Sequence, residues 1–242
     1  MAEVDEGIVE SNMLTANKLA ANKLAANKLA ANKLAANKLA ANSLESHDLM
    51  ATPDGREVMS YIVGCALPTG ASASFTDPDG VAHEYSGWIG LAPGWATTVP
   101  TISERRWVSA CVLARTNLYG LSVQISMRNT NNPILAVTRE DANFNIPEAA
   151  FYGDLFADPP VLYACANRRF ANSGDVARES MRACARSSDG ITTDCGLTFT
   201  GYCGTVYDDG RAAACMASNG SFTPCLGGRV RYAETITTYL TK

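Results

Sequence analysis

A five-residue unit, Asn-Lys-Leu-Ala-Ala, repeats without change from residue 17 to residue 41, and looser copies place leucine at every fifth position from Leu14 to Leu49. On a helix, this period turns each leucine about 140° from the last, so no apolar stripe forms. On a strand, an odd period sends successive leucines to opposite faces. Three structures stay open for the repeat: a solenoid with flat sides of five residues, a helix, or an unstructured spacer.

Composition divides the chain into four segments. We expect an acidic N-terminal segment, a five-residue-repeat stalk, a mixed α/β module and a cysteine-rich module at residues 1–12, 13–50, 51–160 and 161–242. The stalk holds no cysteine, aromatic residue or glycine, whereas all three tryptophans lie in the α/β module and six of the eight cysteines lie in the last segment. We therefore expect the stalk to be separable from the globular head that the two modules form.

The overall charge and hydropathy exclude several classes of partner. A formal net charge of −4 gives no basic surface of the kind that nucleic-acid-binding proteins carry, so we expect no nucleic-acid partner. No apolar run approaches the roughly 18 residues of a membrane-spanning helix, so we expect no membrane-spanning segment. Phosphate-binding loops of the Gly-x-x-x-x-Gly-Lys type are absent from the sequence, and we expect no cofactor.

The cysteines indicate the compartment. Their number is even, no Cys-x-x-Cys pair occurs, and neither histidine lies near a cysteine, which favours disulfides over a zinc site. We expect all eight in disulfides: Cys65, Cys111, Cys165, Cys184, Cys195, Cys203, Cys215 and Cys225. This pattern predicts an extracellular or cell-surface protein, although residues 1–12 show no hydrophobic leader.

Two of the disulfide pairs follow from expected local structure. Cys65 and Cys111 each fall on the apolar face of an expected helix, so a bridge between the two helices is the simplest pairing. Cys215 and Cys225 lie almost symmetrically about Asn219-Gly220, which favours a hairpin turn because both residues accept positive φ. The other four cysteines are expected to pair among themselves.

The remaining patterns predict an α+β fold: a disulfide-stapled globular head with short antiparallel strands and two to four helices, preceded by the repeat stalk. Thr101 and Glu104 form a capping-box pattern at the start of a helix expected to run to Leu118. The other expected helices are 55–66, a short one from Pro147 through Phe156, and 175–186. The expected strands are 73–75, 81–85, 121–127 and 134–137, with a closing strand over 230–240.

Several short segments resemble those of uncharacterised bacterial proteins in which five-residue Asn/Leu/Ala repeats precede a cysteine-containing module. The matching segments are Cys65-Ala66-Leu67-Pro68, Ile89-Gly90-Leu91-Ala92-Pro93, Arg106-Trp107-Val108-Ser109-Ala110-Cys111 and Ala150-Phe151-Tyr152-Gly153. The resemblance implies export to the cell surface or beyond, and it implies no catalytic residue.

The repeat itself partly resembles pentapeptide-repeat proteins, which coil into a four-sided β-helix with leucine or phenylalanine pointing inward. That family places a small residue two positions before the central leucine and asparagine or aspartate one position before it. Here Asn17 and Lys18 occupy those positions before Leu19, so the Ala-Asn pair is shifted by one.

Candidate chemical groups are few. His83 is the only histidine of the head and the candidate base of a catalytic triad. Glu84, Glu148 and Asp154 are the other candidate catalytic residues, because a glycosidase needs two carboxylates across a cleft. The ordinary alternative for His83 is a surface strand residue.

Two further groups are candidate binding sites. Trp88 and Trp95 are candidates for stacking on a sugar, the alternative being burial in the core. Asp77 and Asp79 could begin a calcium loop, but Asp-Pro-Asp-Gly is also ordinary turn chemistry.

These observations favour a secreted or cell-surface structural or binding protein of unknown ligand, with the repeat as a spacer or assembly element. Its expected partners are the cell envelope, a polysaccharide or a second copy of the chain. The alternative is a secreted hydrolase acting on polysaccharide or peptide. The sequence favours a non-enzymatic role because no nucleophile motif accompanies His83.

Overall fold

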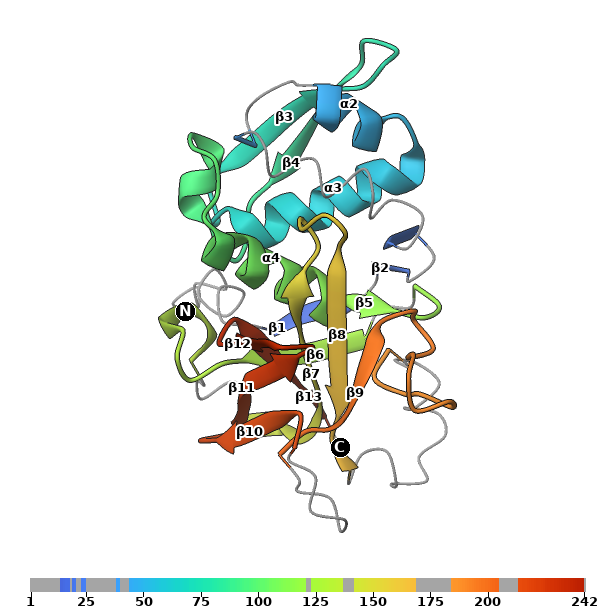
Figure 1. Ribbon diagram of the computed structural model, residues 1–242. Helices are drawn as coiled ribbons and strands as arrows, with labels where there is room; N and C mark the ends of the chain where they lie inside the picture. The colour runs from blue at the N-terminus through green and yellow to red at the C-terminus, as the bar shows by residue number, and fades with distance from the viewer. Residues whose placement is uncertain are drawn as a thin grey trace, which may run out of the picture.

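The computed structural model describes residues 14–17, 19–20, 23–24, 38–39, 44–120, 123–136, 142–168, 184–204 and 213–241. Its α-helices are α2 (Leu44–Met50), α3 (Pro53–Ala66) and α4 (Ile102–Ala114). Short 3-10 helices cover Pro93–Ala96 (η2) and Pro133–Leu135 (η3). Figure 1 shows α2, α3 and a hairpin at one end of the molecule, with α4 between them and the main sheet.

The other regular elements of the described chain are strands. They are β1 (Leu14–Asn17), β2 (Leu19–Ala20), β3 (Ser72–Thr76), β4 (Ala82–Ser86), β5 (Thr116–Asn117), β6 (Val123–Arg128), β7 (Phe144–Asp154), β8 (Val161–Ala166), β9 (Thr198–Tyr202), β10 (Cys215–Ser218), β11 (Ser221–Gly227), β12 (Val230–Tyr232) and β13 (Thr235–Thr241). The α+β class expected from the sequence is confirmed.

A six-stranded sheet in the order β1-β6-β13-β7-β8-β9 organises the head. All neighbouring pairs are antiparallel except β8 and β9, which run parallel. The C-terminal strand β13 lies between β6 and β7, so the last residues of the chain complete the middle of the sheet. The α/β and cysteine-rich segments distinguished by composition therefore share this one sheet.

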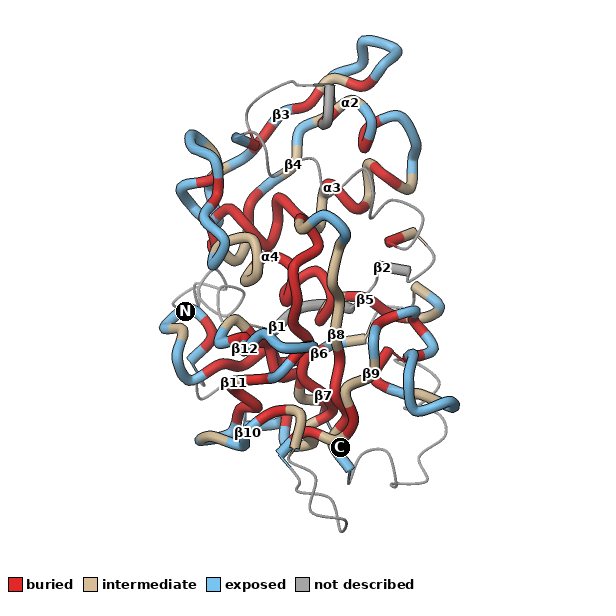
Figure 2. Tube along the Cα trace, in the orientation of Figure 1, coloured by how far each residue is buried: buried red, intermediate tan, exposed pale blue. Residues whose placement is uncertain are grey.

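The strand β7 is buried on both faces. Ala149 and Phe151 belong to the large core that also contains α3 and α4, whereas Ala150 and Tyr152 belong to a second, smaller core with Cys165. This division follows from the two-residue period of a strand. The second core lies against the three-stranded sheet β10-β11-β12. Figure 2 shows buried positions running through α3, α4 and β7.

Both long helices begin at the caps that their sequences indicate. The Thr52 side chain accepts from the Gly55 N–H at the start of α3. In α4, Thr101 and Glu104 form the expected capping box. The expected extension of this helix to Leu118 is wrong, because the chain leaves the helix after Ala114 and forms β5.

Three other local expectations are corrected. The short helix expected from Pro147 is instead mostly part of β7. Both faces of this strand are buried from Glu148 onward, so residues 149–152 form an apolar run rather than an alternating pattern. The strand expected at 134–137 is a 3-10 turn as far as it is described. The single closing strand is two, β12 and β13, in different sheets. Most of the helix expected at 175–186 falls on residues 175–183, which lie outside the described ones. The next two residues, Cys184 and Ala185, form a turn.

Four disulfides join all eight cysteines, and no cysteine is free. Cys65–Cys111 links α3 to α4, as expected, and Cys215–Cys225 closes the β10–β11 hairpin, whose turn contains Asn219 with φ 42° and Gly220 with φ 78°. The other two pairs are Cys165–Cys203 and Cys184–Cys195. Within the described residues, no helix combines the length and the apolar character that crossing a bilayer would need.

The described part of the repeat contacts the head, and the expectation that the stalk can be separated from the head stays a prediction. The backbone of β1 pairs with β6, and that of β2 pairs with β5. Leu24 and Leu39 are buried in the large core, and the Leu39 N–H donates to the Trp95 carbonyl at 2.9 Å. The choice between solenoid, helix and spacer concerns repeat residues that lie mostly outside the described ones.

The substitution Leu39→Ala tests this packing. Because the Leu39 side chain is fully buried, the change should lower the free energy of unfolding by about 2–5 kcal/mol. The neighbouring Lys38 is exposed, so Lys38→Ala should change stability by no more than about 0.5 kcal/mol. Urea unfolding measures both variants. Equal stabilities for the two would show that the repeat adds nothing to the core.

Candidate functional site

The structure brings together two of the sequence candidates, Asp77 and His83, at the β3–β4 hairpin. One Asp77 oxygen, Oδ1, accepts from the N–H groups of Asp79 at 3.0 Å and Val81 at 2.9 Å. The other oxygen, Oδ2, lies 2.9 Å from His83 Nε2. Gly80 completes the turn with φ 83°. Asp77–Gly80 is therefore a turn whose carboxylate ties the hairpin to His83.

These hydrogen bonds stabilise the ionised carboxylate. The His83 hydrogen bond, followed by the Val81 N–H, holds the pKa of Asp77 below its ordinary value. The Arg56 guanidinium adds a positive charge at 4.0 Å. Among the described residues, Asp77 is the only one whose side chain forms a hydrogen bond with the His83 ring. The pair thus supplies the acid and base of a catalytic triad, and among the described residues no nucleophile hydrogen-bonds to His83.

The carboxylates considered for glycoside hydrolysis occupy separate places. Glu84 is exposed on β4 and accepts from the Ser72 hydroxyl at 2.7 Å. Glu148 is fully buried and accepts from the Thr238 hydroxyl at 2.8 Å. Asp154 pairs with Arg105 at 3.1 Å, and burial raises its pKa while Arg105 opposes that rise.

Two of these carboxylates can be compared directly because they lie on one strand. Glu148 and Asp154 are six positions apart on β7, which corresponds to about 20 Å at the usual strand rise. The two catalytic carboxyl groups of a glycosidase lie no more than about 10 Å apart. Glu148 and Asp154 are therefore too distant to act as such a pair.

The two candidate tryptophans have different surroundings. Trp95 is fully buried and meets the Phe156 ring edge-on at a centroid distance of 5.0 Å, so it offers no face to a ligand. Trp88 is only half-buried and lies beside a cation, Arg115. Of the two candidate tryptophans, Trp88 is therefore the one that lies next to a charged side chain, that of Arg115.

Arg115 lies between two aromatic rings supplied by distant segments. Its guanidinium carbon is 4.4 Å from the centroid of Tyr61 on α3 and 5.0 Å from that of Trp88. Its Nε is buried without a hydrogen-bond partner, and Nη1 donates to Cys65 Sγ at 3.9 Å. The guanidinium is therefore held by ring faces and has hydrogen-bonding capacity left over.

The charge on Arg115 has no acidic partner in the described part of the chain. Burial lowers its pKa to about 10, so the side chain stays charged at neutral pH. It follows α4 directly, and the negative end of that helix offsets part of the cost of burial. This arrangement was not predicted, because the sequence contains no signal that brings residues 61, 88 and 115 together.

Comparison with known proteins adds no further site residue: no family model, no curated protein and no solved structure matches the chain.

The Asp77 turn leads to a prediction about calcium. Both carboxylate oxygens of Asp77 already accept hydrogen bonds, and calcium requires six to eight oxygen ligands. Millimolar calcium added to chelator-treated protein should leave the thermal midpoint unchanged. A clear rise with calcium, absent with magnesium, would identify an ion site at the hairpin.

The lowered pKa of Asp77 also predicts a pH dependence. A carboxyl whose pKa falls on folding contributes stability above its ordinary value of 3.8, and this contribution disappears as the pH falls through the folded value. Wild type should exceed Asp77→Asn in stability above about pH 5, and the difference should close in stronger acid. Urea unfolding across this range measures the difference, with the exposed Asp79→Asn as control. Parallel pH profiles for wild type and Asp77→Asn would contradict the assignment.

Proposed function

We propose that this protein is an exported or cell-surface binding protein that holds an anionic group of its ligand at Arg115, between Tyr61 and Trp88. The ligand class is an acidic polysaccharide, whose sugar rings carry carboxylates. One observation carries this proposal: a largely buried guanidinium that lies against two aromatic rings and has no acidic partner in the described part of the chain.

The chemistry of the site favours such a ligand. A carboxylate accepts charge-assisted hydrogen bonds from a guanidinium and would restore the charge balance that Arg115 lacks. Trp88 and Tyr61 are half-buried, so their rings supply apolar surface next to the charge. Sugars bind where an aromatic face and a few polar groups converge.

The location outside the cytosol is supported by the four disulfides, since such bridges persist in oxidising compartments. The repeat would then act as a spacer or assembly element, of which Leu24 and Leu39 lie in the large core. The hydrolase alternative has less support, because the His83–Asp77 pair lacks a nucleophile in the described chain and the carboxylates of β7 are far apart.

Titration with tri-galacturonate tests the proposal. Binding should quench or shift tryptophan fluorescence through Trp88, and Arg115→Met should weaken it about tenfold or more, the equivalent of one lost charge-assisted hydrogen bond. Arg229 is exposed and is the matched control, so Arg229→Met should bind as wild type does. Trp88→Phe should bind with the fluorescence change lost.

Two results would overturn this proposal. One is equal affinity of wild type and Arg115→Met for tri-galacturonate. The other is equal affinity of wild type for tri-galacturonate and for neutral maltotriose. Circular dichroism of each variant establishes that it is folded before binding is compared.

A further inference from the structure

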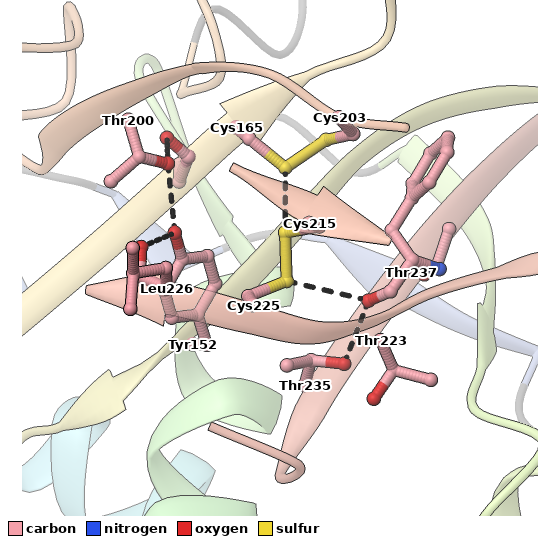
Figure 3. The surroundings of a disulfide bond; sticks show 12 residues. Tyr152, Cys165, Thr200, Cys203, Cys215, Thr223, Cys225, Leu226, Thr235 and Thr237 are labelled. Carbon is pink, nitrogen blue, oxygen red and sulfur yellow. Dashed lines mark hydrogen bonds between the residues drawn. A yellow bond between two sulfur atoms is a disulfide. The ribbon is translucent and has the colours of Figure 1, made fainter. Parts of the chain in front are cut away.

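Two of the disulfides touch each other. Cys165–Cys203 joins β8 to the residue after β9, and Cys215–Cys225 closes the β10–β11 hairpin. The Sγ atoms of Cys165 and Cys215 are 3.1 Å apart, as the dashed line between them in Figure 3 shows. Among the described residues, the Sγ atoms of Cys165, Cys203 and Cys215 are the only three cysteine sulfurs within 4.8 Å of one another.

The surrounding structure holds these sulfurs in place. All four cysteines are no more than 2% exposed and lie in the small core between the two sheets. The Cys203 N–H donates to the Ala166 carbonyl on β8 at 2.8 Å, and the Gly204 N–H donates to the Cys215 carbonyl at 2.9 Å. These backbone bonds keep the end of β9 next to β8 on one side and next to the start of the hairpin on the other.

A separation of 3.1 Å lies in the range from which positioned groups react, about 3–3.5 Å. Disulfide exchange proceeds by attack of a thiolate on a disulfide sulfur. Figure 3 also shows the Cys165 sulfur beyond the Cys215 end of the Cys215–Cys225 bond. If Cys165 loses Cys203, its thiolate therefore already faces a sulfur that it can attack.

We propose that the two bridges can exchange partners. When the bond of Cys165 to Cys203 is reduced, Cys165 forms a new disulfide with Cys215. An external dithiol first reduces Cys165–Cys203 and is itself oxidised to a disulfide, which leaves two thiols in the protein. The Cys165 thiolate then attacks Cys215 Sγ. The Cys165–Cys215 bond forms, the Cys215–Cys225 bond breaks, and Cys225 leaves as a thiolate that takes up the proton released by Cys165.

The exchange moves the covalent link. Before it, one bridge joins neighbouring parts of the large sheet and the other closes a hairpin; after it, the bridge joins β8 to β10 and so connects the two sheets. The released Cys225 thiol already has an acceptor, because its sulfur lies 3.4 Å from the Phe222 carbonyl oxygen. A two-electron reduction therefore leaves the three-stranded sheet attached through Cys165–Cys215. This device acts independently of the Arg115 site.

The double variant Cys203→Ser/Cys225→Ser tests the proposal without an added reductant. The substitutions leave Cys165 and Cys215 without their usual partners. When the variant is made under oxidising conditions, these two cysteines should form a Cys165–Cys215 disulfide, so that neither remains a free thiol. The matched variant Cys165→Ser/Cys215→Ser should keep two free thiols, at Cys203 and Cys225. Thiol counting under denaturant and mass mapping of a non-reduced digest measure both variants.

A control and a wild-type measurement complete the test. The control variant Cys195→Ser removes the partner of Cys184. The Cys184 thiol should stay free, because among the described residues the Cys184–Cys195 bridge belongs to no group of three close sulfurs. Wild type treated with limiting dithiol and then alkylated should carry label on Cys203 and Cys225 together with a Cys165–Cys215 bridge. Two free thiols in Cys203→Ser/Cys225→Ser, or label on Cys165 and Cys203 alone in wild type, would overturn the proposal. The wild-type measurement decides the question even if a variant does not fold.

Discussion

The burial of β7 on both faces is the constraint on which the rest of the head depends. One face packs against α4 and, through it, α3, and the other packs against the small sheet, with two disulfides in the core between them. Because a strand presents alternate residues to its two faces, the sequence Ala149-Ala150-Phe151-Tyr152 supplies both cores at once. A polar group left without a hydrogen-bond partner at any of these buried positions would cost about 1–3 kcal/mol.

The two cores differ in how they are stabilised. The large core is built from helices and leucines, including Leu24 and Leu39 of the repeat, and it resembles the interior of an ordinary domain. The small core holds few apolar side chains, and two disulfides with a group of tyrosines fill much of it. Covalent links compensate for a thin core because they restrict the unfolded chain. The same crowding brings the sulfurs of Cys165 and Cys215 into contact.

Three carboxylates of the head each have a polar partner, whereas Arg115 has no acidic partner in the described part of the chain. Asp154 has Arg105, Asp77 has His83, and Glu148 has Thr238. Arg115 has two rings and the end of a helix instead. Burying a charge without a counter-ion is costly, so such a group is a natural place for a ligand of opposite charge.

The sequence alone determined the features that depend on neighbouring residues. The capping box of α4, the Asn219-Gly220 hairpin with its disulfide and the Asp77 turn are local, and so were predictable. The fold class followed from the same local signals. Tertiary structure decided the rest: β7 became a strand because two cores cover it, and α4 ended early because β5 found a partner in the repeat. The contact of Arg115 with Tyr61 and Trp88, and that between Cys165 and Cys215, join segments far apart in the chain, so no local pattern could reveal them.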